Sequence, residues 1–467
     1  MSNLFQKELK VVNVGLESFK RTLDESGVDC MQVDWRPPLA VSPQDGAAID
    51  ANREIIEQAN RKALERITAG QPFLTGLGIA GELVPGMRRD LILHAGPPIT
   101  WERMCGPMRG AVMGALVFEG LAGTPEEAEA LAASGKIGFE PCHHHGAVGP
   151  MAGIISASMP VFVVENAAFG NRAYATMNEG LGKVLRYGAY GPEVIERLKW
   201  MASMLYPALK DAVASAGRID LKAVISQALH MGDEVHNRNR AATSLLYRAL
   251  APHVVRTCGD REVAAKVLEF ISGNDHFFLN LSMAASKACL DPARGIANSS
   301  VAVAIARNGT DFGVQLAGTG DAWFTGPAPV PDALFFAGFT KADANPDIGD
   351  SAITETYGLG GFAIAAAPAI VQFVGGKAAD ALDYTRQMYG ITAGENQAFQ
   401  IPALDFRGAP CGIDCVKVVE TGVLPFIDTG VAHKKPGIGQ VGAGVLSAPA
   451  EPFIAAFQGL AETFRLR

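Results

Sequence analysis

The chain has 467 residues and a formal net charge of −8, because 40 Lys and Arg stand against 48 Asp and Glu. A hydrophobic content of 48% excludes a disordered chain, and an acidic balance without Lys/Arg clusters argues against nucleic-acid binding. Only 19% of the residues are charged and 52 are glycine. This composition is typical of a multi-domain enzyme with much buried or subunit-facing surface, so we expect a homo-oligomer.

The sequence gives no sign of export or of membrane insertion. Residues 1–10 lack the apolar segment of a secretory signal. The most apolar run, 362–371, is about ten residues long, far short of the ~20 that a spanning helix needs. Seven cysteines without a C-x-x-C pair indicate free thiols rather than disulfides. We therefore expect a cytoplasmic protein that does not bind membranes.

The first predicted elements form a Rossmann-like βαβ unit. It has a β-branched strand at 10–14, a periodic helix at 16–26 and a second strand at 28–35. Only Gly15 occupies the first turn, so the glycine-rich dinucleotide fingerprint is missing. The elements expected next are a polar helix over 47–69, strands and turns over 71–99, helices over 104–120 and 124–134, and strands over 137–142 and 160–165.

A block of amphipathic helices occupies 192–290, where apolar residues recur every 3.6 positions. The strand pattern then returns as a hairpin, with strands at 300–307 and 310–316 around the turn Asn308-Gly309. The elements expected beyond it are an apolar helix after Gly358–Gly361, a helix over 378–389, strands over 416–419, 423–427 and 441–446, and a closing helix over 452–464.

These elements predict an α/β and α+β multi-domain protein. A Rossmann-like unit would occupy 1–70, and later strands could complete its sheet. An α+β domain at 71–190 would carry a histidine-rich loop. A small all-helical domain is expected over 191–295, and an irregular α+β domain over 296–467.

The densest group of functional side chains follows the strand at 137–142. His143, His144 and His145 are consecutive, and Gly146 and Gly149 come next. In an extended chain, His143 and His145 would share one face. Imidazoles transfer protons near neutral pH or bind metals, and glycines let backbone N–H groups approach an anion. A histidine-bearing surface loop is the alternative interpretation.

The spacing His143-x-His145 is also similar to the first metal-ligand pair of amidohydrolases. That family needs a (β/α)₈ barrel with further ligands at later strand ends. The helical block at 192–290 leaves too few alternating βα units for a barrel. Metal-dependent hydrolysis of a small amide therefore stays an alternative. No cofactor is expected at the favoured site, and a divalent metal belongs only to this alternative.

A second polar group joins two helices of the block. His236, Asn237, Arg238 and Arg240 lie close together there, and either guanidinium could hold a carboxylate or a phosphate. If the next helix begins near Asn237, its N-terminal N–H groups would strengthen an anion site. A solvated helix junction is the alternative. The nearby segment 273–276 more simply predicts a helix N-cap.

Two later loops combine glycine with polar residues. Thr319 lies between two glycines and could admit an anionic group, although a plain turn explains it equally well. Lys434 and Lys435 precede GIGQVG, which formally matches G-x-G-x-x-G but opens onto a strand instead of a helix. We therefore expect these lysines to lie near an anionic substrate rather than a dinucleotide.

Several segments together resemble the YlbE-like family associated with FdrA-like proteins, which includes the large subunit of bacterial oxamate carbamoyltransferase. They are NVGLESF at 13–19, VDWRPP at 33–38, TGLGIAGELVPGM at 75–87, CHHHGAVGPMAG at 142–153, GDEVHNRN at 232–239 and DTGVAHKKPGIGQVGAG at 428–444. The resemblance covers essentially the whole chain. It implies a Rossmann-like N-terminal unit, a small helical domain and two irregular α+β domains.

The resemblance also implies a transferase subunit of allantoin degradation, in purine catabolism, that works with an FdrA-like subunit and a smaller third subunit. The implied reaction is phosphorolysis of oxalurate, a small anionic substrate, to oxamate and carbamoyl phosphate. The Ser-Thr-Arg-Thr and His-Pro-x-Gln motifs of the aspartate and ornithine carbamoyltransferases are absent. Any carbamoyl transfer by this chain therefore requires a different site. A further alternative is that the chain is a non-catalytic subunit of an FdrA-like complex.

Phosphate attack on a carbamoyl carbon needs an anion site, a donor for the developing oxyanion and an acid for the leaving nitrogen. From the residues themselves we assign the acid or oxyanion donor to His143, His144 or His145. Arg238 and Arg240 are expected to hold the anionic groups, with His236 nearby.

Overall fold

The chain is a mixed α/β protein in a computed structural model that describes residues 10–15, 17–33, 35–370 and 377–466. Within these ranges the strands form six small separate sheets rather than one large sheet. The expected mixed α/β, multi-domain class is confirmed. No helix in the described ranges combines the length and the apolar character needed to cross a membrane.

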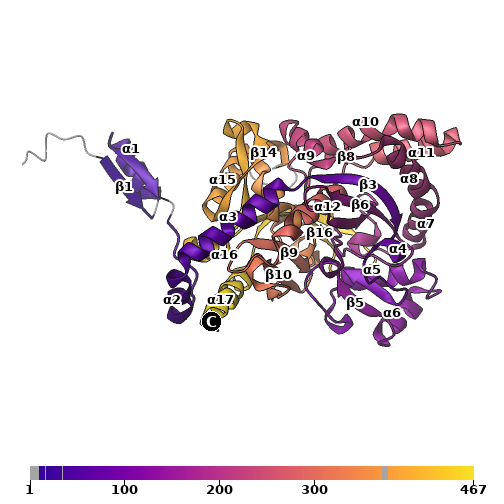
Figure 1. Cartoon of the computed structure of the whole chain (residues 1–467), viewed down its shortest axis with the longest axis horizontal. Helices are drawn as coiled ribbons and strands as arrows, with labels where there is room; N and C mark the ends of the chain where they lie inside the picture. The colour runs from indigo at the N-terminus through magenta and orange to yellow at the C-terminus, as the bar shows by residue number, and fades with distance from the viewer. Residues whose placement is uncertain (1–9, 16, 34, 371–376, 467) are drawn as a thin grey trace, which may run out of the picture.

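The N-terminal βαβ unit contains β1 (Lys10–Val14), α1 (Glu17–Glu25) and β2 (Asp29–Val33), with the two strands parallel. Figure 1 shows this unit standing apart from the rest of the chain. Its sheet has only these two strands, so the expectation that later strands complete a Rossmann-like sheet is wrong for the described residues. Leu16 and Asp34, which were expected in the helix and in the second strand, lie outside the described residues.

Two helices replace the single one expected over 47–69. They are α2 (Pro43–Ala51) and α3 (Arg53–Ala69), and the chain bends between them at Asn52. The start of α2 lies before the expected one because Ser42 caps it, accepting a hydrogen bond from the Asp45 amide at 3.1 Å. Figure 1 shows α3 running along the main body of the protein.

An antiparallel sheet follows, with the strand order β7-β6-β3-β8. Its strands are β3 (Pro72–Ile79), β6 (Pro160–Asn166), β7 (Arg172–Thr176) and β8 (Ile219–Asp220). A separate parallel pair is formed by β4 (Leu91–His94) and β5 (Gly138–Pro141). The helices of this region are α4 (Ala80–Leu83), α5 (Gly106–Phe118) and α6 (Pro125–Ala133). The apolar helix expected near 104–120 is confirmed as the buried α5.

The helical block is confirmed. Its members are α7 (Pro192–Trp200), a π-helical turn (Met201–Leu205), α8 (Tyr206–Ala216), α9 (Leu221–His230), α10 (Arg240–Thr257), α11 (Arg261–Ser272) and α12 (Leu279–Leu290). Strand β8 interrupts the block and pairs with β3, so the block is tied to the preceding sheet. Every residue of helix α12 is buried, so this helix has no face exposed to solvent.

The predicted hairpin is confirmed as β9 (Ala302–Asn308) and β10 (Asp311–Leu316), with the connecting turn one residue later than expected. The remaining strands are β11 (Phe324–Pro327), β12 (Ala333–Phe335), β13 (Ile348–Gly349), β14 (Thr392–Ile401), β15 (Arg407–Ile413), β16 (Phe426–Ala432) and β17 (Gln440–Ser447). The remaining helices are α13 (Ile353–Thr356), α15 (Ala378–Met388), α16 (Cys415–Thr421) and α17 (Glu451–Arg465).

Two expectations in the C-terminal part are wrong. The β-branched run 416–419 is helix α16 instead of a strand, because the Asp414 carboxylate accepts from the amide of Val416 at 3.0 Å and caps the helix. The segment after Gly360 forms short 3₁₀ turns up to Ile370 instead of an apolar helix. Pro368 cannot donate a helical hydrogen bond there. The end of that expected helix, at 371–376, lies outside the described residues.

The largest apolar core is shared by all parts of the main body. It includes Ile67 of α3, Phe162 of β6, Leu281 of α12, Val303 of β9 and Cys411 of β15. These residues come from each of the four expected domains. The domain boundaries near 70, 190 and 295 therefore stay a prediction, while the core itself joins the helical block to its neighbours.

Candidate functional site

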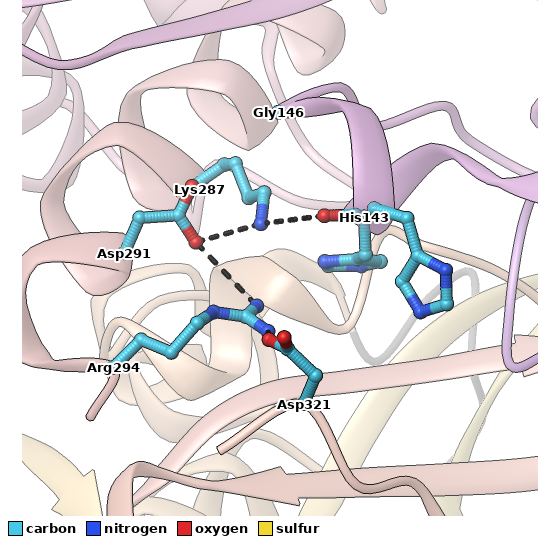
Figure 2. Close-up of a pocket in the computed structure, with 7 residues that line it drawn as sticks. His143, Gly146, Lys287, Asp291, Arg294 and Asp321 are labelled. Carbon is cyan, nitrogen blue, oxygen red and sulfur yellow. Dashed lines mark hydrogen bonds and ion pairs between the residues drawn. The ribbon is translucent and has the colours of Figure 1, made fainter. Parts of the chain in front are cut away.

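A polar pocket of about 550 Å³ forms where three segments distant in sequence meet (Figure 2). The first segment is the histidine-rich turn, the second is the end of α12 with the 3₁₀ turn after it, and the third is the loop before β11. The pocket is lined by His143, His144, Gly146, Lys287, Asp291, Arg294 and Asp321.

The histidine-rich segment is not extended. Cys142–His145 form a 3₁₀ turn that ends at Gly146, which has a φ of 64°. The expectation that His143 and His145 share a face is therefore wrong. His145 contacts the Pro85 carbonyl through Nδ1 at 2.6 Å and Glu140 Oε2 through Nε2 at 2.7 Å. His143 faces Asp350 instead, so the two imidazoles do not form the ligand pair of an amidohydrolase.

His143 is fully buried at the pocket, and neither of its ring nitrogens has a hydrogen-bond partner. Its Nε2 lies 3.5 Å from Asp350 Oδ1. Burial lowers the pKa of His143, although Asp350 acts in the opposite direction. Asp350 is itself fixed by the amides of Gly96 at 2.8 Å and Gly149 at 3.1 Å. Gly149 thus positions Asp350 and does not line the pocket.

His144 is the more accessible imidazole. Trp323 donates a hydrogen bond from Nε1 to His144 Nε2 at 3.0 Å, so the ring proton of neutral His144 must be on Nδ1. Burial lowers the pKa of His144, and the neighbouring His143 and Arg294 lower it further. His144 is therefore a neutral hydrogen-bond donor at pH 7.

Lys287 is the buried cation of the site, with 1% of its surface exposed. Its Nζ donates to Asp291 Oδ1 at 2.6 Å and to the His143 carbonyl at 3.3 Å (Figure 2). Burial lowers the pKa of Lys287, Asp291 raises it and Arg294 lowers it again, with a net decrease. An ammonium group with a lowered pKa gives up its proton more readily near neutral pH.

Arg294 is the second cation. Its Nη1 donates to Asp321 Oδ1 at 2.9 Å, while Nη2 lies 3.7 Å from Asp291 and has no hydrogen-bond partner. Because an unpartnered buried donor is costly, a bound anion would satisfy it. Sequence reasoning missed both Arg294 and Lys287. The available signal was that Lys287 is the only charged residue in α12, whose other residues are all uncharged.

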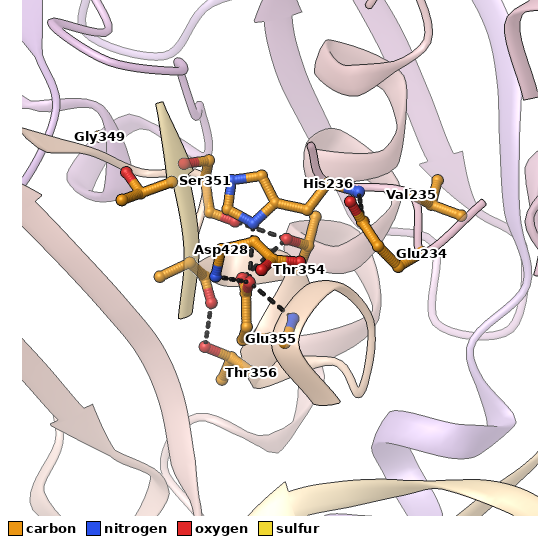
Figure 3. A network of polar contacts seen from close by, with 12 residues as sticks. Glu234, Val235, His236, Gly349, Ser351, Thr354, Glu355, Thr356 and Asp428 are labelled. Atoms are coloured by element: carbon orange, nitrogen blue, oxygen red, sulfur yellow. Dashed lines mark hydrogen bonds and ion pairs between the residues drawn. The ribbon is translucent and has the colours of Figure 1, made fainter. Parts of the chain in front are cut away.

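His236 belongs to a different, buried network (Figure 3). Its Nδ1 lies 2.7 Å from Glu355 Oε1, which also accepts from the amides of Asp428 at 3.0 Å and Gly361 at 3.1 Å. Glu234 accepts a hydrogen bond from the His236 amide. His236 therefore connects two buried carboxylates and does not line the polar pocket.

Asp428 is the least satisfied member of this network, since both of its carboxyl oxygens are buried without a partner. Burial, and then the charge of Glu355, raise the pKa of Asp428 well above its usual value. In the unfolded chain this carboxyl ionises near pH 3.9, at about its reference pKa. The folded protein consequently loses stability as the pH rises from that value through the raised pKa.

The variant Asp428→Asn is expected to be more stable than the wild type at neutral pH, because the amide never has to ionise. Its free energy of unfolding, measured in urea from pH 4 to 8, should lack the decline that Asp428 gives the wild type. Asp383→Asn is the control, since Asp383 is exposed on α15. An unchanged pH slope in Asp428→Asn would contradict the protonated state of this carboxyl.

The remaining predicted residues are not brought to the polar pocket. Asn237, Arg238 and Arg240 line a second pocket, and α10 begins at Arg240 rather than near Asn237. Thr319 donates to the Leu316 carbonyl at 3.3 Å within a turn. Lys434 and Lys435 are exposed and line neither pocket, with Lys434 Nζ donating to the Ala342 carbonyl at 2.5 Å. In the part of the chain that the structure describes, no three His, Cys, Asp or Glu side chains are placed to share a metal ion.

A family model and a relative of known family indicate the same family. A family model described as oxamate carbamoyltransferase subunit AllG matches residues 137–351. All seven residues of the polar pocket lie inside this range. "Oxamate carbamoyltransferase subunit AllG" of Escherichia coli K12 is 47% identical over 411 residues, which cover 87% of this chain and 98% of that protein.

Two further relatives carry no functional description. The "uncharacterized protein YahG" of E. coli K12 is 48% identical over 467 residues and covers 99% of both chains. A crystal structure of a conserved protein of unknown function from Enterococcus faecalis V583 is 50% identical, with a TM-score of 0.87, and covers 88% of this chain and 99% of that one. The match at this identity supports the fold described above.

Proposed function

The chain belongs to the family of the oxamate carbamoyltransferase subunit AllG, and from this premise we propose that it transfers a carbamoyl group at the polar pocket as one subunit of a complex. The observation that carries the proposal is the unpartnered Arg294 Nη2 beside the buried Lys287 and the neutral His144. Together they offer a cationic hydrogen-bond donor for an anion, a proton source and a neutral hydrogen-bond donor.

The proposed reaction is phosphorolysis of oxalurate. A phosphate oxygen forms a bond to the carbamoyl carbon, the bond from that carbon to the amide nitrogen breaks, and the nitrogen takes up a proton. The products are carbamoyl phosphate and oxamate. The developing oxyanion needs a hydrogen-bond donor, and the departing nitrogen needs an acid.

Each role has a candidate in the pocket. Arg294 Nη2 is suited to the phosphate because guanidinium groups bind phosphate with directed hydrogen bonds. Lys287 is suited to deliver the proton, since its lowered pKa makes its ammonium group a better acid. His144 Nδ1–H is suited to stabilise the carbamoyl oxyanion. His143, packed against Asp350 and bound to Lys287 through its carbonyl, positions the lysine.

The family membership supports work in a multi-subunit complex, because the AllG relative is named as a subunit. We propose an FdrA-like subunit and a smaller third subunit as partners, following the resemblance noted in the sequence.

Arg294→Gln, assayed in the complex with its partner subunits, is expected to raise the KM for phosphate by about 10- to 100-fold, the value of a hydrogen bond to a charged group. The KM for oxalurate should change less. Formation of carbamoyl phosphate from oxalurate and phosphate is the measurement. Arg88→Gln is the matched control, because Arg88 is exposed and lies outside the pocket, where it pairs with Asp90 at 3.1 Å. An unchanged KM for phosphate would contradict the proposal and favour a non-catalytic role for this subunit.

A further inference from the structure

A second pocket, of about 410 Å³, lies where the loop before α10 meets strand β12, and it shares no lining residue with the polar pocket. Its apolar side is formed by Leu181, Leu334, Phe335 and Phe336, and both Leu334 and Phe336 are 47% exposed. Apolar pockets of this size with a few convergent polar groups are typical of small-molecule sites. A compound as small as oxalurate would not need this apolar wall.

The polar side of the pocket has three buried atoms without hydrogen-bond partners: Asn237 Nδ2, Asn239 Oδ1 and His276 Nδ1. Asn239 is fully buried, and its Nδ2 donates to the His236 carbonyl at 2.5 Å, so Oδ1 is the free acceptor. Burial lowers the pKa of His276 to about 3, so its ring is neutral. A backbone hydrogen bond with Asn237 engages the ring N–H and leaves Nδ1 as a second acceptor.

These atoms specify the ligand that would satisfy them. Two acceptors and one donor require a ligand edge with two N–H donors and one acceptor. Adenine provides its amino group beside a ring nitrogen, and guanine provides two N–H donors beside a carbonyl oxygen. Cytosine offers the same amino group beside a ring nitrogen, whereas uracil offers one donor against two acceptors on the corresponding edge. Planar bases also stack on aromatic side chains such as Phe335 and Phe336.

The charged residues of the pocket complete the pattern. Arg240 is exposed, and its nearest acid is Asp275, with 3.8 Å between Nε and Oδ1. Arg238 lies beside it, with Nε bound to the Gly232 carbonyl at 2.9 Å. A weakly paired guanidinium next to an apolar pocket is suited to a phosphate group. We propose that this pocket binds a nucleotide whose base carries an amino group, with the base between the phenylalanines and the Asn237–Asn239–His276 edge and the phosphate at Arg240.

Calorimetric titration of the full-length chain with ATP, GTP, CTP and UTP tests the proposal. ATP, GTP and CTP are expected to bind at least about tenfold more tightly than UTP, the value of a well-formed pair of base contacts. Arg240→Ala and Phe336→Ala should each weaken ATP binding by about tenfold, through loss of a charged contact and of stacking. Both side chains are largely exposed, so the fold should persist. Arg248→Ala on the same helix and Phe169→Ala at another exposed site are the matched controls.

Equal affinity for UTP and for the three nucleotides whose base carries an amino group, or ATP binding that survives both substitutions, would overturn the proposal. Binding of oxalurate or oxamate alone, abolished by the same substitutions, would overturn it in favour of a substrate site. Loss of partner subunits without any nucleotide binding would overturn it in favour of an interface. Carbamoyl transfer is tested separately through Arg294, so failure of one proposal does not imply failure of the other.

Discussion

Replacing Arg307 with methionine is expected to lower the free energy of unfolding by about 3–5 kcal/mol, the cost of breaking a buried ion pair from one side. Arg307 Nε lies 2.6 Å from Asp347 Oδ2, and both side chains are fully buried. The same guanidinium donates to the Gly349 carbonyl at 2.8 Å. Asp347 would keep a hydrogen bond from Thr429 at 2.7 Å but lose its counter-charge. Urea denaturation followed by circular dichroism measures the loss.

The double variant Arg307→Met/Asp347→Leu should recover part of this stability, because it removes both buried charges. Arg386→Met is the control: Arg386 and Asp383 form an exposed pair at 3.1 Å, and surface pairs contribute about 0–1 kcal/mol. If Arg307→Met lowered the free energy of unfolding no more than Arg386→Met does, the stabilising role of the buried Arg307–Asp347 pair would be contradicted. The Arg307–Asp347 pair also fixes the start of β13, which leads to Asp350 beside His143. Arg307→Met should therefore also reduce carbamoyl transfer.

Lys287→Met is expected to reduce carbamoyl transfer by about 10²- to 10⁴-fold, the range for removing a general acid, while leaving the protein folded. Burial lowers the pKa of Lys287, so the unfolded chain binds this proton more tightly than the folded one. The wild type therefore gains stability as the pH rises through the lowered pKa toward about 10.4. Methionine removes this dependence, and the variant should be at least as stable as the wild type at neutral pH.

Two further variants separate acid catalysis from charge and from packing. Lys287→Arg keeps the positive charge but should stay inactive, because a guanidinium does not release its proton in proteins. Lys266→Met, at an exposed position on α11, should keep full activity. Restored activity in Lys287→Arg would show that the lysine acts as a charge, and full activity in Lys287→Met would remove it from the mechanism.

Local sequence patterns predicted those elements whose stabilising contacts lie close in sequence. The hairpin β9–β10 follows from two β-rich runs around a tight turn, and α17 follows from its apolar period and Pro452 in the first turn. The run 416–419 was misassigned because a short apolar segment fits a strand or a helix equally, and the capping side chain of Asp414 decided the outcome.

The sequence by itself determined the family and the mixed α/β class, and it predicted a functional site at the loop of His143 and His144. Only the tertiary structure brought Lys287 and Arg294 to that loop and separated it from Arg238 and Arg240. The physical reason is that α12 is buried in the core shared by the whole main body, which places its last turn beside the histidine-rich turn. Such contacts depend on packing between distant segments, and no local pattern records them.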